Sequence, residues 1–135
     1  MKKIQKQLMY GDLVLVKPSM MPIRICAIHK NKVGYHSHIN MLEWVWMNLL
    51  VPIPITEEFL VKNGFSKDVC TYIPCMYISA DKRITISKCS NMIDRDWYIH
   101  IDNKDMESIA SGDIQFVHQF QNKLNDAEIE MEVIL

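Results

Sequence analysis

Four side chains that could bind a metal lie close together in the sequence: Cys26, His29, His36 and His38. Tetrahedral zinc needs four converging nitrogen or sulfur ligands at roughly 2.0–2.3 Å. If this segment forms a hairpin, His36 and His38 share a face, whereas the odd separation of Cys26 and His29 places them on opposite faces. Two histidines alone make a weak site. The pattern therefore favours exposed strand histidines over a metal site, and it predicts no cofactor.

Two pairs of carboxylates, Asp94 with Asp96 and Asp102 with Asp105, surround the segment WYIHI. Such pairs can serve a hydrolase or a nuclease, but acidic residues at strand ends are more often solvated turn residues. The sequence contains neither a Gly-x-Ser-x-Gly nucleophile elbow nor a glycine-rich phosphate loop. A small hydrolase-like or nuclease-like enzyme is therefore only the second alternative, and no catalytic residue is assigned.

Aromatic side chains on a sheet, next to basic ones, would indicate a stacking surface for nucleic acid. The candidates are Tyr35, Trp44, Trp46, Trp97 and Tyr98, with Arg24, Lys30 and Lys32 nearby. Residues 1–67 carry nine basic and four acidic side chains, a net +5, whereas residues 68–135 carry six and twelve, a net −6. The basic residues are scattered, and an isoelectric point near 6.5 argues against a general DNA-binding protein. Nucleic-acid binding is therefore the first alternative function.

The segment IQFVHQFQNKL predicts a helix whose polar side carries amides and imidazole instead of charged groups. Its apolar side spans an arc of about 100°, the width of a core-facing stripe. The polar side carries Gln115, His118, Gln119, Gln121 and Asn122. Buried polar groups need hydrogen-bond partners, so this face either bonds the protein's own backbone or binds a partner. We favour the backbone for at least one of His118 and Asn122. We keep Gln115, His118, Gln119 and Asn122 as candidate interaction residues.

Around these residues the hydrophobic pattern predicts an α+β fold built on an antiparallel β-meander. Strands are expected within residues 13–17, 23–29, 33–39, 43–53, 69–78, 83–89, 95–102 and 106–113. Two helices are expected, at about residues 56–63 and 113–126. Thr56 and Asp113 are suited to cap their N-termini, and Gly64 is suited to end the first helix. In the last segment, EIEMEVIL, glutamates alternate with apolar residues, which predicts a C-terminal strand.

The length of 135 residues suits a single domain, 1–135. We expect a β-rich N-terminal part at about 8–55, and a second part with the remaining sheet and both helices at about 56–135. Whether the N-terminal part is SH3-like or barrel-like stays open. No apolar run reaches the roughly 20 residues of a membrane helix. No signal peptide is visible, so we expect a cytoplasmic protein with no membrane partner. The spacing of the four cysteines indicates neither disulfides nor zinc, and free, buried cysteines are expected.

Three stretches of the chain together resemble a family of small uncharacterised proteins that is abundant in Bacteroidetes genomes, prophages and mobile elements. The stretches are GDLVLVKP, PIPITEEFLVKNGF and IQFVHQFQNKLNDAEIEMEVIL. Members of that family have a middle helix like PIPLTEEWLLKFGF and a C-terminal helix and strand like YVHQLQNLYFALTGEEL. The middle motif is matched at Pro52, Pro54, Thr56, Glu57, Glu58, Leu60, Gly64 and Phe65. The C-terminal motif is matched at Val117, His118, Gln119, Gln121 and Asn122, with Phe120 in place of leucine. The chain then departs from it, with KLNDAE in place of the apolar residues.

The resemblance implies an architecture and a genomic setting, but no chemistry, because the family has no established activity. We therefore expect an accessory protein of phage or mobile-element origin that is a non-catalytic binding module. Its partner would be an unknown protein or a second copy of itself. Trp44 and Trp46, or the closing strand, would supply the contact.

Overall fold

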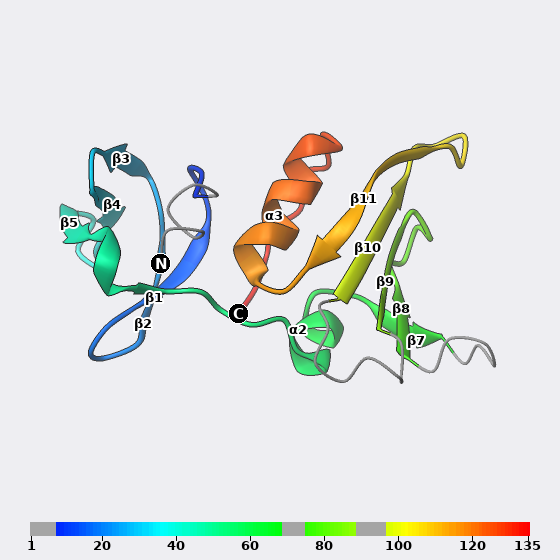
Figure 1. Cartoon of the computed structure of the whole chain (residues 1–135), viewed down its shortest axis with the longest axis horizontal. Helices are drawn as coiled ribbons and strands as arrows, with labels where there is room; N and C mark the ends of the chain where they lie inside the picture. The colour runs from blue at the N-terminus through cyan, green and yellow to red at the C-terminus, as the bar shows by residue number, and fades with distance from the viewer. Residues whose placement is uncertain (1–7, 69–74, 89–96) are drawn as a thin grey trace. The chain divides into compact units, whose positions relative to one another are not determined.

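The computed structural model of the chain describes residues 8–68, 75–88 and 97–135. The described residues divide into two compact units. The first unit comprises the chain up to Pro54 together with Phe116–Asn122, and the second comprises Ile55–Gln115 together with Lys123–Leu135. The described strands form three antiparallel sheets, which are accompanied by two α-helices and a short 3₁₀ helix (Figure 1). The predicted α+β class is therefore confirmed.

Two three-stranded sheets make up most of the first unit. One has the order β2-β1-β6 and consists of β1 (Leu13–Val16), β2 (Met21–Arg24) and β6 (Leu50–Val51). The other, which we call the hairpin sheet, has the order β3-β4-β5 and consists of β3 (Ala27–His29), β4 (Lys32–His36) and β5 (Leu42–Trp46). The 3₁₀ helix η1 (Met47–Leu49) connects β5 to β6. Neither sheet is closed, so the barrel-like closure stays a prediction.

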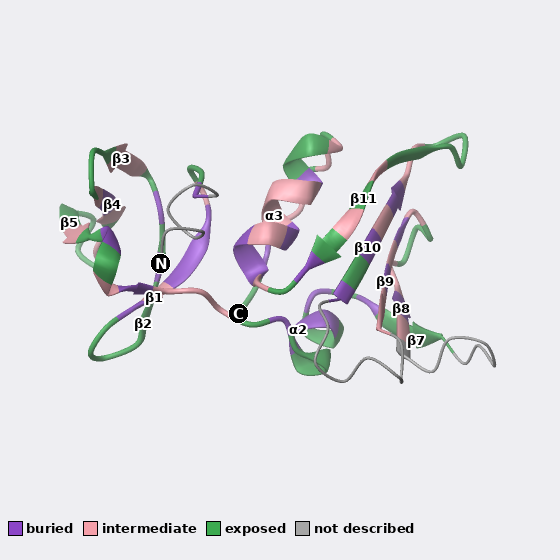
Figure 2. Ribbon diagram, viewed as in Figure 1, coloured by how far each residue is buried: buried purple, intermediate pink, exposed green. Residues whose placement is uncertain are grey.

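The segment from β2 to β3 takes part in both sheets of the first unit. The N–H of Ile25 donates to the carbonyl of Asp12, and the N–H of Cys26 donates to the carbonyl of Gly34, both at 2.9 Å. The single strand predicted at 23–29 is therefore two strands with a break, and the break lets one segment join two sheets. Apolar side chains from both sheets and from the segments beside them form one core: Leu8, Val14, Val16, Ile23, Ile25, Val33, Met47 and Leu50. Figure 2 colours buried positions purple, among them most of β1.

In the second unit, helix α2 (Glu57–Lys62) has the predicted boundaries and caps. Thr56 Oγ1 accepts the N–H of Phe59 at 3.1 Å, as an N-cap should. Gly64 has a φ of 87°, a left-handed conformation that favours glycine, and it ends the helix. The buried Phe65 then donates its N–H back to the carbonyl of Leu60 at 3.0 Å. Local sequence signals alone decide this element.

The second unit also contains a five-stranded antiparallel sheet of order β11-β10-β9-β8-β7. Its strands are β7 (Ser66–Asp68), β8 (Cys75–Ile78), β9 (Ile84–Lys88), β10 (Trp97–Asp102) and β11 (Ser108–Ile114). Ile86 and Ile99 are buried opposite each other on one face, whereas Tyr98 is exposed on the other. The alternation predicted for β9 and β10 is therefore confirmed. The expected strand residues 69–74, 89 and 95–96 lie outside the described residues.

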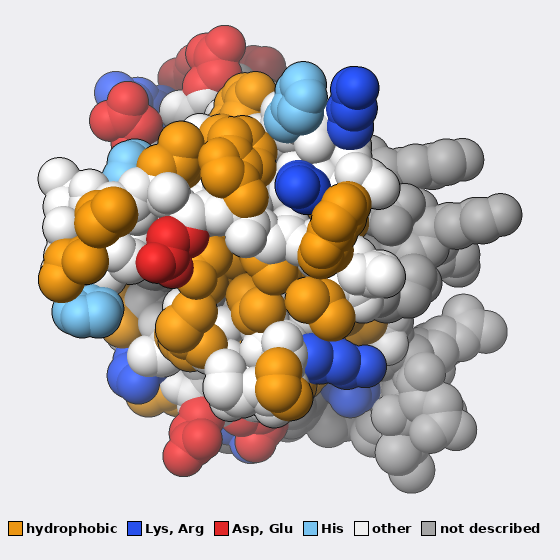
Figure 3. Space-filling view, turned by 90° about the vertical axis from the view of Figure 1, so that its left-hand side faces the viewer, with side chains coloured by type: hydrophobic (Ala, Val, Ile, Leu, Met, Phe, Trp, Pro, Cys, Tyr) orange, Lys and Arg blue, Asp and Glu red, His pale blue; other side chains and the backbone are white. Residues whose placement is uncertain are grey.

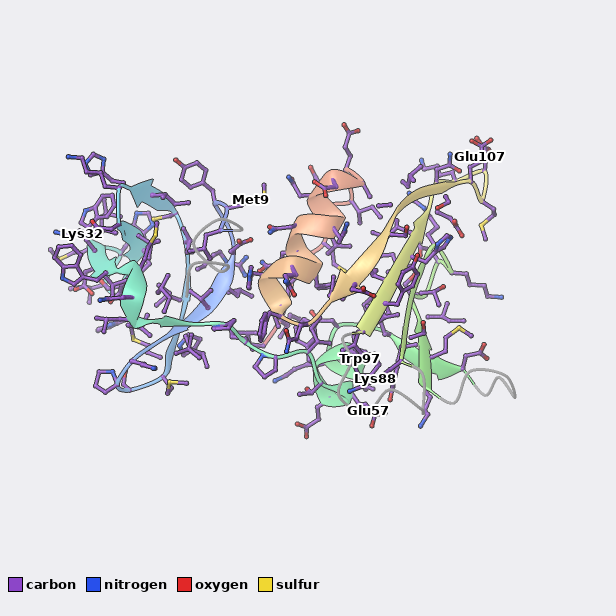
Figure 4. The ribbon with its side chains drawn as sticks, viewed as in Figure 1. Met9, Lys32, Glu57, Lys88, Trp97 and Glu107 are labelled. Atoms are coloured by element: carbon purple, nitrogen blue, oxygen red, sulfur yellow. The ribbon has the colours of Figure 1, made fainter. Side chains whose placement is uncertain are left out.

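Trp97 anchors the first residue of β10 in the interior of the second unit. Its indole N–H donates to the carbonyl of Ile55 at 3.2 Å. The ring meets Tyr77 edge to face at 6.1 Å, and the ammonium of Lys88 lies 5.4 Å from the ring centroid (Figure 4). Because this indole is buried and bonded, it is not available as a stacking surface.

Helix α3 (Val117–Asp126) begins later than the predicted residue 113. Asp113 is not its N-cap, because Asp113 lies in β11 and pairs with Tyr98 of β10. The extended pairing along β10 therefore overrides the capping signal of an aspartate. The helix is capped differently: Gln119 Oε1 accepts the N–H of Phe116 at 3.0 Å, and the N–H of Val117 donates to the carbonyl of Ile53 at 2.8 Å.

The closing segment 129–135 is not the strand that the sequence predicts, because it pairs with no strand in the described part of the chain. The predicted alternation of burial is nevertheless present, with Val133 buried and the glutamates exposed. The side chain of Asn63 replaces a neighbouring strand: its Nδ2 donates to the carbonyl of Ile134, and its Oδ1 accepts the N–H of Ile134, both at 2.7 Å. An amide can present the same donor and acceptor as a peptide group, which a pattern of apolar residues does not reveal.

A candidate interaction surface

Strand β5 places three large apolar side chains on one face of the hairpin sheet. Leu42, Trp44 and Trp46 alternate along the strand and are 47%, 46% and 49% exposed. Side chains alternate between the faces of a strand, so Val45 points to the other face, where it packs against the core. We call Leu42, Trp44 and Trp46 the tryptophan row. Core packing does not account for its exposure, and it includes the predicted contact residues Trp44 and Trp46.

The outer edge of β5 is unpaired in the described part of the chain, since β5 is the last strand of the hairpin sheet. Two bonds bracket its pairing with β4: Ser37 N–H to Met41 O at 2.9 Å, and Met47 N–H to Asn31 O at 2.8 Å. Hydrogen-bonded and non-hydrogen-bonded pairs alternate along an antiparallel ladder. The register of β4 with β5 therefore directs the backbone groups of Glu43 and Val45 towards β4. The backbone N–H and C=O groups of the tryptophan row point to the free edge.

A lysine and two histidines border the tryptophan row on the same face. The ammonium of Lys32 lies 4.3 Å from the centroid of the Trp46 ring, and Figure 4 shows Lys32 at this end of the first unit. The ring of Trp44 meets that of His29 edge to face at 6.5 Å. The register of the three strands brings Ala27, His29, Lys32, Gly34 and His36 to this face together with the row. None of these residues is acidic, so the face combines aromatic rings with a basic border.

Gly34 makes room for the ring of Trp44. The two residues are paired across β4 and β5, and a Cβ at Gly34 would lie 3.4 Å from the Trp44 ring. The same Cβ would lie 3.1 Å from the side chains of both Ala27 and Leu42, which is tighter than ordinary van der Waals contact. The absence of a side chain therefore lets the Trp44 ring lie across β4 towards His29.

His36 and His38 both line an open groove of about 450 Å³ beside the hairpin sheet. The groove is lined by Met21–Arg24, Tyr35–Ile39 and Glu43. A hydrogen bond from the Tyr35 hydroxyl to Glu43, at 2.9 Å, raises the pKa of Tyr35. Within the described ranges, no three His, Cys, Asp or Glu side chains are placed to hold a metal ion. The predicted burial of the cysteines is wrong at Cys26, which is an exposed free thiol.

The amide side of α3 bonds the protein's own backbone at Gln121. The Oε1 of Gln121 accepts the N–H of Leu13 at 2.8 Å, and its Nε2 donates to the carbonyl of Gly11 at 2.9 Å. Strand β6 pairs with β1 only at Leu15 and Val16, so these two groups lie beyond its end. The Gln121 side chain therefore bonds backbone groups of Gly11 and Leu13 at the point where β6 no longer pairs with β1.

His118 lies in the interior instead of on a surface. His118 is 1% exposed, and its ring stacks on Phe116 at a centroid distance of 5.9 Å. Neither ring nitrogen has a hydrogen-bond partner among the residues that the structure describes. Burial lowers the pKa of His118 to about 4, so the ring is neutral at pH 7. Gln115 is exposed, Gln119 and Asn122 are half-buried, and all three interact with other groups. The amide-rich polar side of α3 could be predicted from the sequence. The sequence did not indicate that Gln121 is the residue that bonds two backbone groups.

Of the two proposed carboxylate pairs, only Asp102 and Asp105 lie in the described structure, where each has a different partner. Asp94 and Asp96 lie outside the described residues. Asp102 Oδ1 lies 2.8 Å from Nε2 of His100, whereas Asp105 lies in the next turn and donates its N–H to Asn103 Oδ1 at 2.9 Å. The sequence does contain the signal for the His100–Asp102 pair, because residues two apart on a strand share a face.

No helix in the described part of the chain is long and apolar enough to cross a membrane. Comparisons with protein-family models, with curated proteins and with solved structures gave no match to this chain. The case for function therefore depends on the geometry of the chain itself. The tryptophan row is the feature that core packing and internal hydrogen bonding leave unexplained.

Proposed function

We propose that this chain is a non-catalytic interaction module that binds a protein partner, or a second copy of itself, through the tryptophan row. The observation that carries the proposal is that three half-exposed apolar side chains lie on β5, whose outer edge pairs with no strand of the described ranges. Protein interfaces are enriched in aromatic residues and methionine, and tryptophan is prominent among the residues that dominate binding energy. Two tryptophans on one strand fit such an interface.

Further apolar side chains extend this surface around the β4–β5 hairpin. Ile39 and Met41, in the turn that connects β4 to β5, are 62% and 59% exposed. Figure 3 shows hydrophobic side chains gathered on this side of the molecule, with basic, acidic and histidine side chains among them. Contiguous apolar patches of this kind often mark binding sites, and methionine adapts its shape to a partner. The surface therefore supports the proposal beyond the tryptophan row itself.

The resemblance to small proteins of Bacteroidetes prophages and mobile elements is the ground for the proposed setting. In this proposal the chain is an accessory protein of such an element and acts in the cytoplasm. We also propose that its first unit is barrel-like and related in form to SH3 domains. The support is the segment from β2 to β3, which hydrogen-bonds to both sheets through Ile25 and Cys26.

Replacing Trp44 and Trp46 with alanine is expected to remove binding while the fold is retained, because both side chains are half exposed. Loss of one dominant interface tryptophan costs about 2 kcal/mol or more, which corresponds to at least about thirtyfold in affinity. The measurement is quantitative capture of proteins from extracts of the source cells, with light scattering to detect self-association. A thermal melt of each variant checks the fold.

The matched control is Tyr98→Ala, which removes an exposed aromatic side chain from β10 in the second unit. It should leave both capture and self-association unchanged. If the double tryptophan variant captured the same proteins as the wild type and self-associated equally, the tryptophan row would not be the binding surface.

Binding of single-stranded nucleic acid is the second candidate function. It is favoured by one specific observation: Lys32 and His29 border the exposed rings, and no acidic residue shares their face. Aromatic side chains beside basic ones stack on bases, and such binding weakens strongly with salt. Quenching of tryptophan fluorescence by oligothymidine at low salt, and its loss in the double tryptophan variant, would support this function over the first.

A further inference from the structure

We infer that β5 receives an extended, acidic segment of a partner protein, which joins the hairpin sheet as a fourth strand along the tryptophan row. This inference rests on the proposed function and adds the kind of partner to it. Three features of β5 carry it: the direction of its free backbone groups, the alternation of its apolar side chains and the charge of its surroundings.

The backbone of β5 offers consecutive sites for strand addition. Leu42, Trp44 and Trp46 each direct an N–H and a C=O to the edge that no strand of the described structure covers. An incoming strand would bond these groups in the pattern by which β4 bonds the opposite edge. Exposed strand edges are commonly protected by lysine or proline, and β5 contains neither. This edge is therefore open to a partner.

The side chains of β5 define where the partner must be apolar. Alternate residues of an added strand would fall on the same face as the tryptophan row and lie beside Leu42 and Trp44. Cross-strand contacts between aromatic and β-branched side chains stabilise such pairs. The partner segment should therefore carry β-branched or aromatic residues at every second position.

The charges around the row define where the partner must be acidic. Lys32 holds its ammonium over the ring of Trp46, and Lys30 is exposed in the turn before β4. The one acidic side chain of β5, Glu43, points to the opposite face and accepts the hydroxyl of Tyr35. A carboxylate beside Trp46 would therefore meet Lys32 without opposing negative charge, whereas a basic partner would be repelled.

Two other occupants of this surface give different results in the same experiment. Single-stranded nucleic acid would stack on the rings but would make no use of the outward backbone groups. A second copy of the chain would use those groups but would require no acidic ligand. Of the three occupants, only an acidic peptide strand would use the tryptophan rings, the backbone groups of the strand edge and the basic side chains together.

The test uses a synthetic peptide of about nine residues, the length of a long strand, with isoleucine at alternate positions and glutamates at both ends. A matched peptide carries lysines in place of the glutamates. Binding to the full chain is followed by titration calorimetry at low salt, and oligothymidine is titrated in parallel. The glutamate peptide is expected to bind at least about tenfold more tightly than the lysine peptide.

A pair of variants tests the strand edge. Leu42→Pro removes an outward N–H, and proline is tolerated at edge positions whose N–H faces solvent. Leu42→Ala removes most of the same side chain but keeps the N–H. The proline variant should bind the glutamate peptide about tenfold more weakly than the alanine variant, since one hydrogen bond is lost. Thermal melts establish that both variants are folded, and the comparison of the two peptides on the wild type does not depend on either variant.

Equal binding of the two peptides, or equal binding by the two Leu42 variants, would overturn the inference. Binding of oligothymidine without either peptide would assign the surface to nucleic acid. Dimerisation that the Leu42→Pro variant abolishes, without peptide binding, would assign the edge to a second copy. If capture of proteins depends on Trp44 and Trp46 but the glutamate peptide does not bind, the proposed function stands and this inference fails.

Discussion

The His118→Leu variant is expected to gain about 3 kcal/mol of stability over the wild type as the pH falls from about 6.5 to about 4. This gain is the change in the difference between the two free energies of unfolding. The reason is that the wild-type histidine resists protonation in the folded state. Burial lowers its pKa from 6.5 to about 4, and no group in the described part of the chain bonds its two ring nitrogens to stabilise a charge. Below pH 6.5 the unfolded chain therefore binds a proton that the folded chain does not bind, and stability falls with the pH.

Asp12, in the same unit, makes the stability depend on pH in the opposite direction. Its side chain is 2% exposed, and burial raises its pKa from 3.8 to about 7, although the N–H of Met9 donates to its Oδ2 at 2.8 Å. Between these two values the folded chain keeps a proton that the unfolded chain has lost. Stability from this group is therefore fully present below pH 3.8 and is lost as the pH rises towards 7, by about 4 kcal/mol.

In the wild type, the pH-dependent contributions of His118 and Asp12 to the free energy of unfolding have opposite signs and offset each other between about pH 4 and pH 6.5. A variant that lacks one of the two groups therefore shows the pH dependence of the other. His118→Leu should therefore become more stable towards low pH. Asp12→Asn keeps an acceptor for Met9 and should become less stable there. Urea unfolding at several pH values measures both slopes, and the double variant should show neither. A His118→Leu variant whose stability followed the wild type across this range would show that His118 titrates normally.

Replacing Gln121 with alanine is expected to lower the free energy of unfolding by about 1–3 kcal/mol, because the N–H of Leu13 loses its partner and the carbonyl of Gly11 keeps only the Arg24 guanidinium, at 3.2 Å. Leu13 is buried, and its N–H would be left without the Oε1 that it contacts at 2.8 Å. The carbonyl of Gly11 would lose the Nε2 that it contacts at 2.9 Å. Each buried polar group that is left unpaired costs about 1–3 kcal/mol. Urea unfolding at pH 7 measures the loss.

Two controls separate these hydrogen bonds from a general effect of mutating α3. Asn125→Ala changes an exposed amide at the end of the same helix and should alter the free energy of unfolding by less than about 0.5 kcal/mol. Gln121→Glu keeps an acceptor for Leu13 but places a carboxylate beside the carbonyl of Gly11. This variant should recover stability at low pH, because a protonated carboxyl can donate to that carbonyl. Equal losses for Asn125→Ala and Gln121→Ala would remove the special role of Gln121.

Helix α2 and the faces of strands β9 and β10 could be predicted because their determinants are local. Thr56, Gly64 and Phe65 specify both ends of the helix within a few residues. Alternation alone identifies the buried face of a strand, as at Ile84 and Ile86. Signals of this kind need no knowledge of what lies beside the element.

The start of α3 and the closing segment could not be predicted, because distant partners decide both. Asp113 has the chemistry of an N-cap, but its pairing with Tyr98 keeps it in a strand. The residues from Ile129 onwards alternate as a strand does, yet Asn63 supplies the pairing that a strand would have supplied. Capping propensity and periodicity describe what a segment can do, and tertiary pairing selects among the choices.

The sequence predicted the two tryptophans of the candidate site but not the strand edge on which they lie. Trp44 and Trp46 could be singled out from residue type and spacing. Their position at the last strand of a sheet depends on strand order, and the space at Gly34 depends on the register of β4 with β5. Neither is encoded locally. The amide side of α3, by contrast, attracted attention through its composition, and its Gln121 bonds the backbone of β1.

Amide hydrogen exchange along β5 tests whether the outward edge of this strand is a binding edge. In the free protein, Glu43 and Val45 should exchange slowly because their N–H groups bond to β4, whereas Leu42, Trp44 and Trp46 should exchange fast. When the glutamate peptide or a captured partner is present at saturation, Trp44 and Trp46 should become protected. Continued fast exchange at Trp44 and Trp46 in the saturated complex would contradict the account.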